Sequence, residues 1–449
     1  MQKYHGRSIC RMLLVLVLGL GLLLSSCGSN DGGVFPAESS DEDYFARLLA
    51  LWGNPDYTSM PVAYFPGNNG KDGWQLWATD GTEAGTRQVK IINNGGDSTP
   101  RDFIRFNHRV FFTADDGAHG WELWVTDGTE AGTKLFKDIL PGTDGSSPYY
   151  LTVFNGRLYF SAYHPDYGQE LWVTDGTEAG TKLVKDIYPD ANSSSPQDLT
   201  VFNGKLYFSA YHPDYGWELW ATDGTEAGTK LVQDICPGDY GSSPRSLTVF
   251  NGKLYFSADH PDYGWELWMT DGTEDGAQLV QDIWPDVGSS SPHDLTVFNG
   301  KLYFNANDGV HGYELWVTDG TETGTKLVKD INPGAGDSDH YCFTVFNGRL
   351  YFSAYHPDYG WELWVTDGTE AGTKLVKDIR PGVGGSYPAD FTFSCDSDDP
   401  FTQINGRLYF GADDGESGYE LWVTDGTEAG TRRVIDINRG PGDGVMSDD

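Results

Sequence analysis

The chain has 449 residues, of which 30 are Lys or Arg and 66 are Asp or Glu, so its formal charge at neutral pH is −36. This charge excludes nucleic acid and bare anionic membranes as expected partners, because both are themselves negative. Aromatic residues make up 14% of the sequence, and Gly is abundant (58) while Met is scarce (5), a composition typical of short strands and tight turns. The composition therefore favours an all-β protein.

The N-terminus has the pattern of an export signal. Three basic residues precede an apolar run from Met12 to Leu24, which is shorter than the roughly 20 residues that a membrane span needs. The run ends in Leu-Ser-Ser-Cys at 24–27, which resembles a bacterial lipobox. We expect residues 1–26 to be a lipoprotein signal peptide and Cys27 to carry the lipid. An ordinary signal peptide cut nearby is the alternative.

The segment after Cys27 indicates where the protein goes. Gly28 stands there instead of Asp, which resembles lipoproteins sorted to the outer membrane of Gram-negative cells. Residues 27–43 are polar and predict a flexible tether, so we expect contact with the membrane through the lipid anchor only. Removal of residues 1–26 takes away three basic residues and no acidic ones, which leaves 27 against 66 and a charge of −39. Cations and basic proteins remain open as partners.

Eight copies of Glu-Leu-Trp-x-Thr-Asp-Gly-Thr-Glu-x-Gly, some with single substitutions, dominate the rest of the chain. The Trp recurs every 47 or 48 residues and, before the last copy, after 58. Repeated units share one continuous core, so we expect a single repeat domain over residues 44–438, followed by an acidic disordered tail at 439–449. The repeated Trp residues, to which we assign a structural role, are Trp77, Trp124, Trp172, Trp220, Trp268, Trp316, Trp364 and Trp422.

One repeat predicts four antiparallel strands. Two apolar runs at 151–154 and 157–162 are joined by Asn155-Gly156, a strong hairpin signal. A third strand is expected at 170–174 and a fourth at 182–187, with a link rich in Pro, Gly and Ser after it. Four such strands in about 48 residues are typical of a β-propeller blade.

The side-chain pattern supports blades that are covered on both faces. In the third strand Leu123 and Val125 alternate with Trp124, so both faces carry large apolar groups. The fourth strand is rich in Lys and is expected at the outer edge. A parallel β-helix is the rival fold, and the repeated Asn-Gly hairpins disfavour it.

The number of blades is not fully determined by the repeats. Third and fourth strands occur eight times, but the first strand is clear in seven copies only, so the first blade is short of a strand. Phe45–Trp52 is the one apolar segment upstream that could supply it, although it reads equally well as a short helix. We expect a β-propeller of eight four-stranded antiparallel blades, with seven blades plus a partial unit as the alternative.

The repeat resembles a known family. Residues 122–129, with Gly132-Thr133, Lys137-Asp138-Ile139 and Pro141-Gly142, closely resemble the bacterial ELW-x-x-DGT repeat proteins, and the match extends over about residues 62–438. Gln75 replaces Glu in the first copy, and Asp275 and Ala277 alter the fifth. The resemblance implies an exported, propeller-like repeat protein and no particular activity.

The repeated Asp residues are the first candidates for a site. Each precedes Gly-Thr at the end of a strand, where an Asp side chain can accept hydrogen bonds from the backbone two residues on. We assign them to turns, with calcium binding as a weaker alternative, since the full EF-hand spacing is missing. The residues are Asp80, Asp127, Asp175, Asp223, Asp271, Asp319, Asp367 and Asp425.

The repeated Glu and His residues are also expected to be structural. Equivalents of Glu170 recur in separate blades and cannot meet at one site, and pairing with the Lys of the fourth strand would explain them. Four copies of His-Pro-Asp-Tyr-Gly begin at His164, His212, His260 and His356 and should lie on one face of the ring, too far apart to share zinc.

Other candidates lie where the repetition breaks. Asp396, Asp398 and Asp399, in the insertion within 389–404, form the best acidic cluster and a weak cation-site candidate, with calcium the only cofactor considered. Cys342 and Cys395 lie in consecutive repeats and could form a disulfide in an oxidising compartment. We expect the insertion and the segment 332–343 to form the specific site.

Two classes of function remain open. The first is a lipid-anchored binding or scaffold module of the bacterial cell envelope, monomeric, with a protein or glycan as its unknown ligand. The second is an envelope hydrolase or lyase with its site in the propeller channel. No catalytic residue is assigned, because the chain has none of the common nucleophile, zinc-protease or phosphate-loop motifs.

Overall fold

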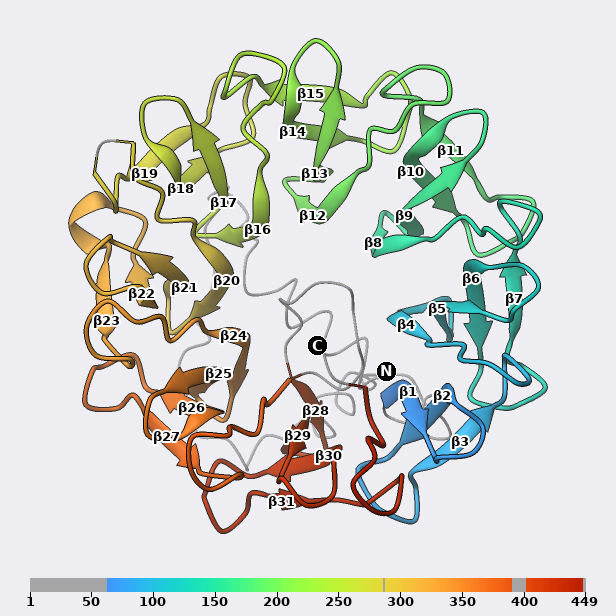
Figure 1. Cartoon of the computed structure of the whole chain (residues 1–449). Coiled ribbons are helices and arrows are strands. Elements are labelled where there is room, and N and C mark those ends of the chain that lie inside the picture. Colours follow the sequence, from blue (N-terminus) through green and yellow to red (C-terminus); the bar gives the residue numbers. More distant parts are fainter. Residues whose placement is uncertain (1–62, 286, 390–400, 447–449) are drawn as a thin grey trace, which may run out of the picture.

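The computed structural model describes residues 63–285, 287–389 and 401–446 and shows a ring of eight antiparallel sheets (Figure 1). The prediction of an all-β, eight-bladed propeller is confirmed. Within each described blade, consecutive strands pair antiparallel, so the parallel β-helix is excluded. No helix in the described part of the chain is both long and apolar enough to cross a membrane.

The strands fall into eight blades in chain order. Blade 1 has β1 (Ala63–Asn68), β2 (Trp74–Thr79) and β3 (Arg87–Lys90). Blade 2 has β4 (Arg101–Phe106), β5 (Arg109–Asp115), β6 (Trp121–Thr126) and β7 (Lys134–Lys137); blade 3 has β8 (Tyr149–Phe154), β9 (Arg157–His164), β10 (Gly168–Thr174) and β11 (Lys182–Lys185). Blade 4 has β12 (Gln197–Phe202), β13 (Lys205–His212), β14 (Gly216–Thr222) and β15 (Lys230–Gln233); blade 5 has β16 (Arg245–Phe250), β17 (Lys253–His260), β18 (Gly264–Thr270) and β19 (Gln278–Gln281).

The second half of the ring repeats this order. Blade 6 has β20 (His293–Phe298), β21 (Lys301–Asn307), β22 (Tyr313–Thr318) and β23 (Lys326–Lys329), with the short 3-10 helix η2 (Glu322–Gly324) before its last strand. Blade 7 has β24 (Tyr341–Phe346), β25 (Arg349–His356), β26 (Gly360–Thr366) and β27 (Lys374–Lys377); blade 8 has β28 (Thr402–Ile404), β29 (Arg407–Asp413), β30 (Tyr419–Thr424) and β31 (Arg432–Arg433). The first strand of blades 2 to 8 faces the centre and the fourth lies outermost (Figure 1).

Blade 1 has three strands within the described residues. Its β1 corresponds to the second strand of the other blades, since Phe65 pairs with Trp77 as Phe160 pairs with Trp172. Pro66 stands in β1 where the other blades have Ser, Thr, Asn or, in blade 8, Gly, and Pro has no N–H to donate to an inner neighbour. The segment Phe45–Trp52 lies outside the described residues, so its part in this blade stays a prediction.

The core lies between blades, as the pattern of two apolar faces predicts. Leu123 and Val125 of blade 2 pack with Leu158, Phe160 and Trp172 of blade 3. Trp124, on the other face of the same strand, packs against blade 1. Each repeated Trp from 124 onward is 4% to 8% exposed, so the ELW segment is mainly a packing element.

The C-terminus closes the ring and corrects the predicted tail. Residues 439–446 continue the propeller: the Gly444 N–H donates to the Tyr419 carbonyl of blade 8, and the Gly444 carbonyl accepts from the Asn68 N–H of blade 1, at 3.0 Å each. Val445 is fully buried and bridges to Gly67. The polar composition of this segment predicts disorder. Burial of one apolar residue, Val445, and backbone hydrogen bonds like those of the linkers between blades are enough to hold it against the ring.

Candidate ligand-binding face and channel

The eight repeats differ mainly on one face of the ring. One face, here called the repeat face, carries the Asn-Gly hairpins and the Asp-Gly-Thr loops, which are nearly identical in the copies. The opposite face, here called the variable face, carries the turns between second and third strands, the linkers between blades and the beginnings of the inner strands. Because the copies share one fold, side chains that differ between them are the ones that the fold does not require.

The Asp-Gly-Thr loops build the repeat face. Asp127 Oδ1 accepts hydrogen bonds from the Thr129 N–H at 3.0 Å and from Thr129 Oγ1 at 2.7 Å, a local turn geometry. The same pair of bonds forms at all eight repeated Asp residues. These hydrogen bonds hold the pKa of the Asp127 carboxyl below its usual value. A turn role accounts for this geometry without an ion.

The same loops also join neighbouring blades. Asn107 of the blade 2 hairpin donates to the Asp175 carbonyl of blade 3 at 3.1 Å. At the ring closure Tyr409 Oη of blade 8 donates to the Gly81 carbonyl of blade 1 at 2.9 Å. Gly224 has φ +93° and a Cβ there would collide with Tyr159 Oη, so Gly is required both by the backbone and by the packing. The Asp-Gly-Thr loop therefore links each blade to a neighbouring blade through hydrogen bonds and close packing.

The repeated Glu residues do not pair with Lys, which corrects the expectation from sequence. Glu170 is fully buried, and its Oε1 accepts from the backbone N–H groups of Tyr188 (3.3 Å) and Ser194 (3.0 Å). Its Oε2 accepts from the Ile187 N–H (3.1 Å) and from Ser194 Oγ (2.5 Å). The carboxylate thus fixes the linker that leaves the blade. The Lys of the fourth strand instead reaches the neighbouring blade, as Lys185 donates to the Thr229 carbonyl of blade 4.

Burial raises the pKa of these carboxyl groups. The pKa rises to about 7 in six blades. At Glu170 the effect of burial exceeds that of the four hydrogen bonds, which by themselves would lower the pKa. The six residues are Glu170, Glu218, Glu266, Glu314, Glu362 and Glu420, and the pKa of Glu122 is also raised. Each carboxyl group is buried and hydrogen-bonded within its own blade. The raised pKa values therefore reflect a repeated structural contact and not one active site.

The histidines of the His-Pro-Asp-Tyr-Gly turns lie on the variable face. His164 stacks on Tyr167 at a centroid distance of 5.2 Å and contacts the Trp172 ring at 5.9 Å. Its Nδ1 accepts from the Asp166 N–H at 3.2 Å, as a turn residue would. Within the described ranges, no three side chains of His, Cys, Asp or Glu are arranged to hold a metal ion.

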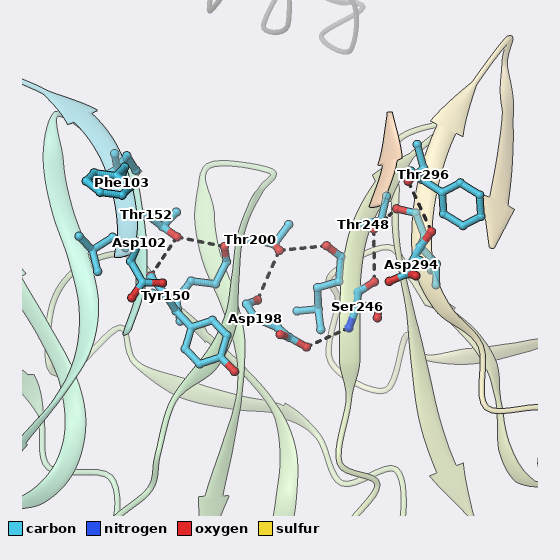
Figure 2. A pocket seen from close by; sticks show the side chains of 16 residues that line it. Asp102, Phe103, Tyr150, Thr152, Asp198, Thr200, Ser246, Thr248, Asp294 and Thr296 are labelled. Carbon is cyan, nitrogen blue, oxygen red and sulfur yellow. Dashed lines mark hydrogen bonds between the residues drawn. The ribbon is translucent and has the colours of Figure 1, made fainter. Parts of the chain in front are cut away.

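A pocket of about 390 Å³ opens in the channel, lined by the inner strands of blades 2 to 6 and by Phe343 of blade 7 (Figure 2). Each of these strands carries a β-bulge, at which a residue other than Gly has a φ between 56° and 59°. Such a backbone is strained and is found often at ligand sites. The bulged residues are Asp102, Tyr150, Asp198, Ser246, Asp294 and Cys342.

Hydrogen bonds between blades stiffen this pocket. Thr152 Oγ1 donates to the Leu199 carbonyl (3.3 Å), Thr200 Oγ1 to the Leu247 carbonyl (3.0 Å) and Thr248 Oγ1 to the Leu295 carbonyl (3.1 Å). Asp198 accepts from the Ser246 N–H at 2.9 Å, which Figure 2 shows between neighbouring strands. The lining mixes carboxylates, hydroxyls and aromatic rings and contains no Lys or Arg. It therefore suits a polar, uncharged or cationic ligand.

An aromatic group lies on the variable face at blade 7. Trp361, at the start of the third strand, contacts Tyr341 at 5.2 Å, Tyr355 at 6.0 Å and Tyr387 at 6.4 Å between ring centroids. Tyr387 is 43% exposed and the other three rings are half-buried. In blade 2 the equivalent position is Trp121, over which the Arg101 guanidinium lies at 3.8 Å. The same Trp position therefore has different neighbours in blades 2 and 7.

Several predicted site residues lie outside the described residues. Cys27 does, as do Asp396, Asp398, Asp399 and Cys395, so the lipid anchor, the cation site and the disulfide stay predictions. Cys342 is buried, at the bulge of β24. The segment 332–343 does reach the channel mouth, because it contains the linker between blades 6 and 7 and the start of β24. Sequence reasoning singled it out because it departs from the repeat.

Comparisons with known proteins add little beyond the architecture. No protein-family model matches the sequence, and no curated protein matches it. Among solved structures, similar ones include a prolyl endopeptidase (12% identity, TM-score 0.47), which covers 75% of this chain, and a puromycin hydrolase (14%, 0.45), which covers 85%. This chain spans 49% and 57% of those two proteins. A third similar structure is the β-propeller domain of the Trilobed protease from Pyrococcus furiosus (14% identity, TM-score 0.43). The match covers 76% of this chain and 99% of that domain.

Proposed function

We propose that this protein is a lipid-anchored propeller of the ELW-x-x-DGT repeat class that binds a glycan at the bacterial cell envelope. The observation that carries the binding role is the distribution of differences among the eight copies, which concentrate on the variable face and around the channel pocket. The export signal and the lipobox support the location.

The variable face suits sugars for two reasons. Half-exposed aromatic rings such as Trp361 and Tyr387 offer apolar faces to the C–H groups of a sugar ring. Carboxylates and hydroxyls in the nearby channel pocket can accept and donate the hydrogen bonds that sugar hydroxyls require. A rigid frame with exposed loops is the usual support for such a site.

Replacement of Trp361 by alanine is expected to weaken glycan binding about fivefold to tenfold, because ring contacts of this kind contribute on the order of 1 kcal/mol. The measurement is a glycan array followed by titration of the strongest ligand. Glu370→Gln, an exposed change on the repeat face, is the matched control and should bind as the parent does. Equal binding by the two variants would contradict the assignment of the site. Capture of an envelope protein with no glycan bound would show that the ligand class is wrong.

Cys27→Ala is expected to abolish incorporation of labelled palmitate in a bacterial host and to release the protein from the membrane fraction, because the lipid is the only proposed anchor. Cys236→Ala keeps the lipobox intact and should incorporate label normally. No label in the parent protein would show that the signal is of the ordinary kind, and label retained in Cys27→Ala would show that another residue carries the lipid.

A further inference from the structure

Four departures from the repeat meet at the junction of blades 6 and 7. Asn305 in β21 replaces the Ser or Thr of most copies, and Asp339 replaces the Ser found at its position in four linkers. His340 replaces Pro, and His293 stands at the variable first position of β20. We call these residues the junction cluster. They come from two strands and one linker, so the fold alone brings them together.

His293 is oriented as a metal ligand usually is. Its Nδ1 lies 2.9 Å from the Ser291 carbonyl oxygen, which can only accept a hydrogen bond, so Nδ1 carries the proton. The lone pair is then on Nε2, which points to Asn305 at 2.9 Å and to Asp339 Oδ1 at 3.7 Å. A backbone carbonyl that fixes the tautomer and the ring in this way is the common outer partner of metal-binding histidines.

Three side-chain atoms of the cluster form a triangle of the right size for an ion. The terminal amide atom of Asn305 lies 2.9 Å from His293 Nε2 and 3.2 Å from Asp339 Oδ1, and the third side is 3.7 Å. The point equidistant from the three atoms is about 1.9 Å from each, close to the roughly 2.0 to 2.2 Å of zinc bonds to nitrogen and oxygen. The side chains would need little movement to reach an ion there.

Asn305 itself has an unfulfilled polar atom. The side chain is fully buried, and its Oδ1 has no hydrogen-bond partner among the described residues. Its Nδ2 faces three acceptors, the third being the His340 carbonyl at 3.4 Å, although an amide has only two protons to donate. Rotation of the amide would bring the oxygen to the corner of the triangle that the nitrogen now occupies, because the two ends of an amide have nearly the same shape. An ion at the centre of the triangle would then replace the N–H groups as the partner of His293 and Asp339.

Charge and access agree with an ion at this point. Asp339 supplies a carboxylate, the side chain that is ordinarily negatively charged at neutral pH. The Asp339 side chain is 53% exposed, which leaves a path from solvent and room for water as a further ligand. Two acceptors that face each other at 3.7 Å are better satisfied by a shared cation than by each other.

We propose that the junction cluster binds one divalent transition-metal ion, of which Zn²⁺ is the best fit, through His293 Nε2, Asp339 Oδ1 and the Asn305 amide oxygen. Imidazole with a carboxylate is a donor set that zinc accepts, and oxygen-only cations such as calcium would not use the imidazole. The ion would tie the linker between blades 6 and 7 to the inner strand of blade 6. This site is independent of the proposed glycan binding.

The test is a calorimetric titration of the chelator-treated protein with zinc chloride. The expected result is one site per chain, whose dissociation constant rises at least about tenfold in His293→Gln and in Asp339→Ser. The second variant carries the Ser that four other linkers have, so it should fold. Cobalt(II) provides a second readout, because its visible absorption should appear in the parent and be lost in Asp339→Ser.

The controls separate this site from the other histidines and from a purely structural cluster. His356→Gln removes a histidine of the same face that also lies near an Asp, and it should leave zinc binding unchanged. Asn305→Ser introduces the residue that four other blades have and should weaken zinc binding. Zinc affinity equal to the parent in both His293→Gln and Asp339→Ser, or no zinc bound by the parent, would overturn the proposal, even if those variants melt at lower temperature.

Discussion

Replacement of Glu170 by alanine is expected to lower the free energy of unfolding by about 3 to 5 kcal/mol. The change removes the acceptor for three backbone N–H groups and one hydroxyl in the linker between blades 3 and 4, of which the Tyr188 N–H is part-buried and the other three are buried. Each unsatisfied buried donor costs on the order of 1 to 3 kcal/mol, part of which water entry would recover. The measurement is denaturant unfolding, with the melting temperature as a second readout.

The natural control for this experiment is already in the chain. Blade 1 has Gln75 at this position, whose Oε1 accepts from the Ile92 N–H and from Ser98 Oγ, while its Nε2 lies within 3.0 Å of three backbone carbonyl oxygens to which its two protons can be donated. Glu170→Gln should therefore cost much less than Glu170→Ala. Equal costs in the two variants would show that the side-chain volume, and not the acceptor, stabilises the linker.

The stability of the protein is expected to fall as the pH rises from about 4.5 to 7. Burial raises the pKa of six repeated Glu residues to about 7 in the folded state, from 4.5 in the unfolded chain. Their stabilising contribution is complete below the unfolded value and is lost as the pH passes through the folded value, because the folded state alone still holds the protons in that window. For one group such a shift corresponds to at most about 3 kcal/mol.

The measurement is the melting temperature between pH 5 and 8 at constant ionic strength. It should be highest at the acidic end, and Glu170→Gln should reduce the slope because it removes one titrating group. Comparison of Glu170→Gln with the parent tests the sign of the pH dependence of this one group, because the other charges of the chain are the same in both proteins. A melting temperature that stays constant or rises across this range would contradict the assignment of raised pKa values.

His340 works in the opposite direction, as do His212 and His356, whose pKa values burial also lowers. His340 is fully buried, and burial lowers its pKa to about 3. Its stabilising contribution is present above the unfolded value of about 6.5 and is lost as the pH falls toward 3. His340→Pro, which restores the residue of the other linkers, should therefore make the protein more tolerant of acid. The six Glu residues outnumber these histidines, so the overall trend remains a loss of stability with rising pH.

Local patterns determined much of this protein without the tertiary structure. Asn155-Gly156 between two apolar runs predicts a hairpin, because Asn and Gly readily adopt the positive φ angles of a two-residue turn. Leu123 alternating with Trp124 predicts a blade covered on both faces. The period of the repeat then predicts eight blades, although the missing first strand of blade 1 leaves seven blades plus a partial unit as the alternative. Asp127 was assigned to a turn because the hydrogen bonds that an Asp makes there are with its own neighbours in the chain. These features are local, so sequence alone reveals them.

Only the tertiary structure decided which distant residues meet. Glu170 was expected to pair with Lys, but its partner Ser194 lies 24 residues away in a linker whose path no periodicity predicts. Val445 was assigned to a disordered tail, yet it closes the ring against Gly67, because burial depends on the neighbour that arrives and not on local composition. Asn305 and Asp339 contact across the junction of two blades for the same reason. Sequence periodicity fixes the face on which a side chain lies, and the packing of blades fixes what it touches there.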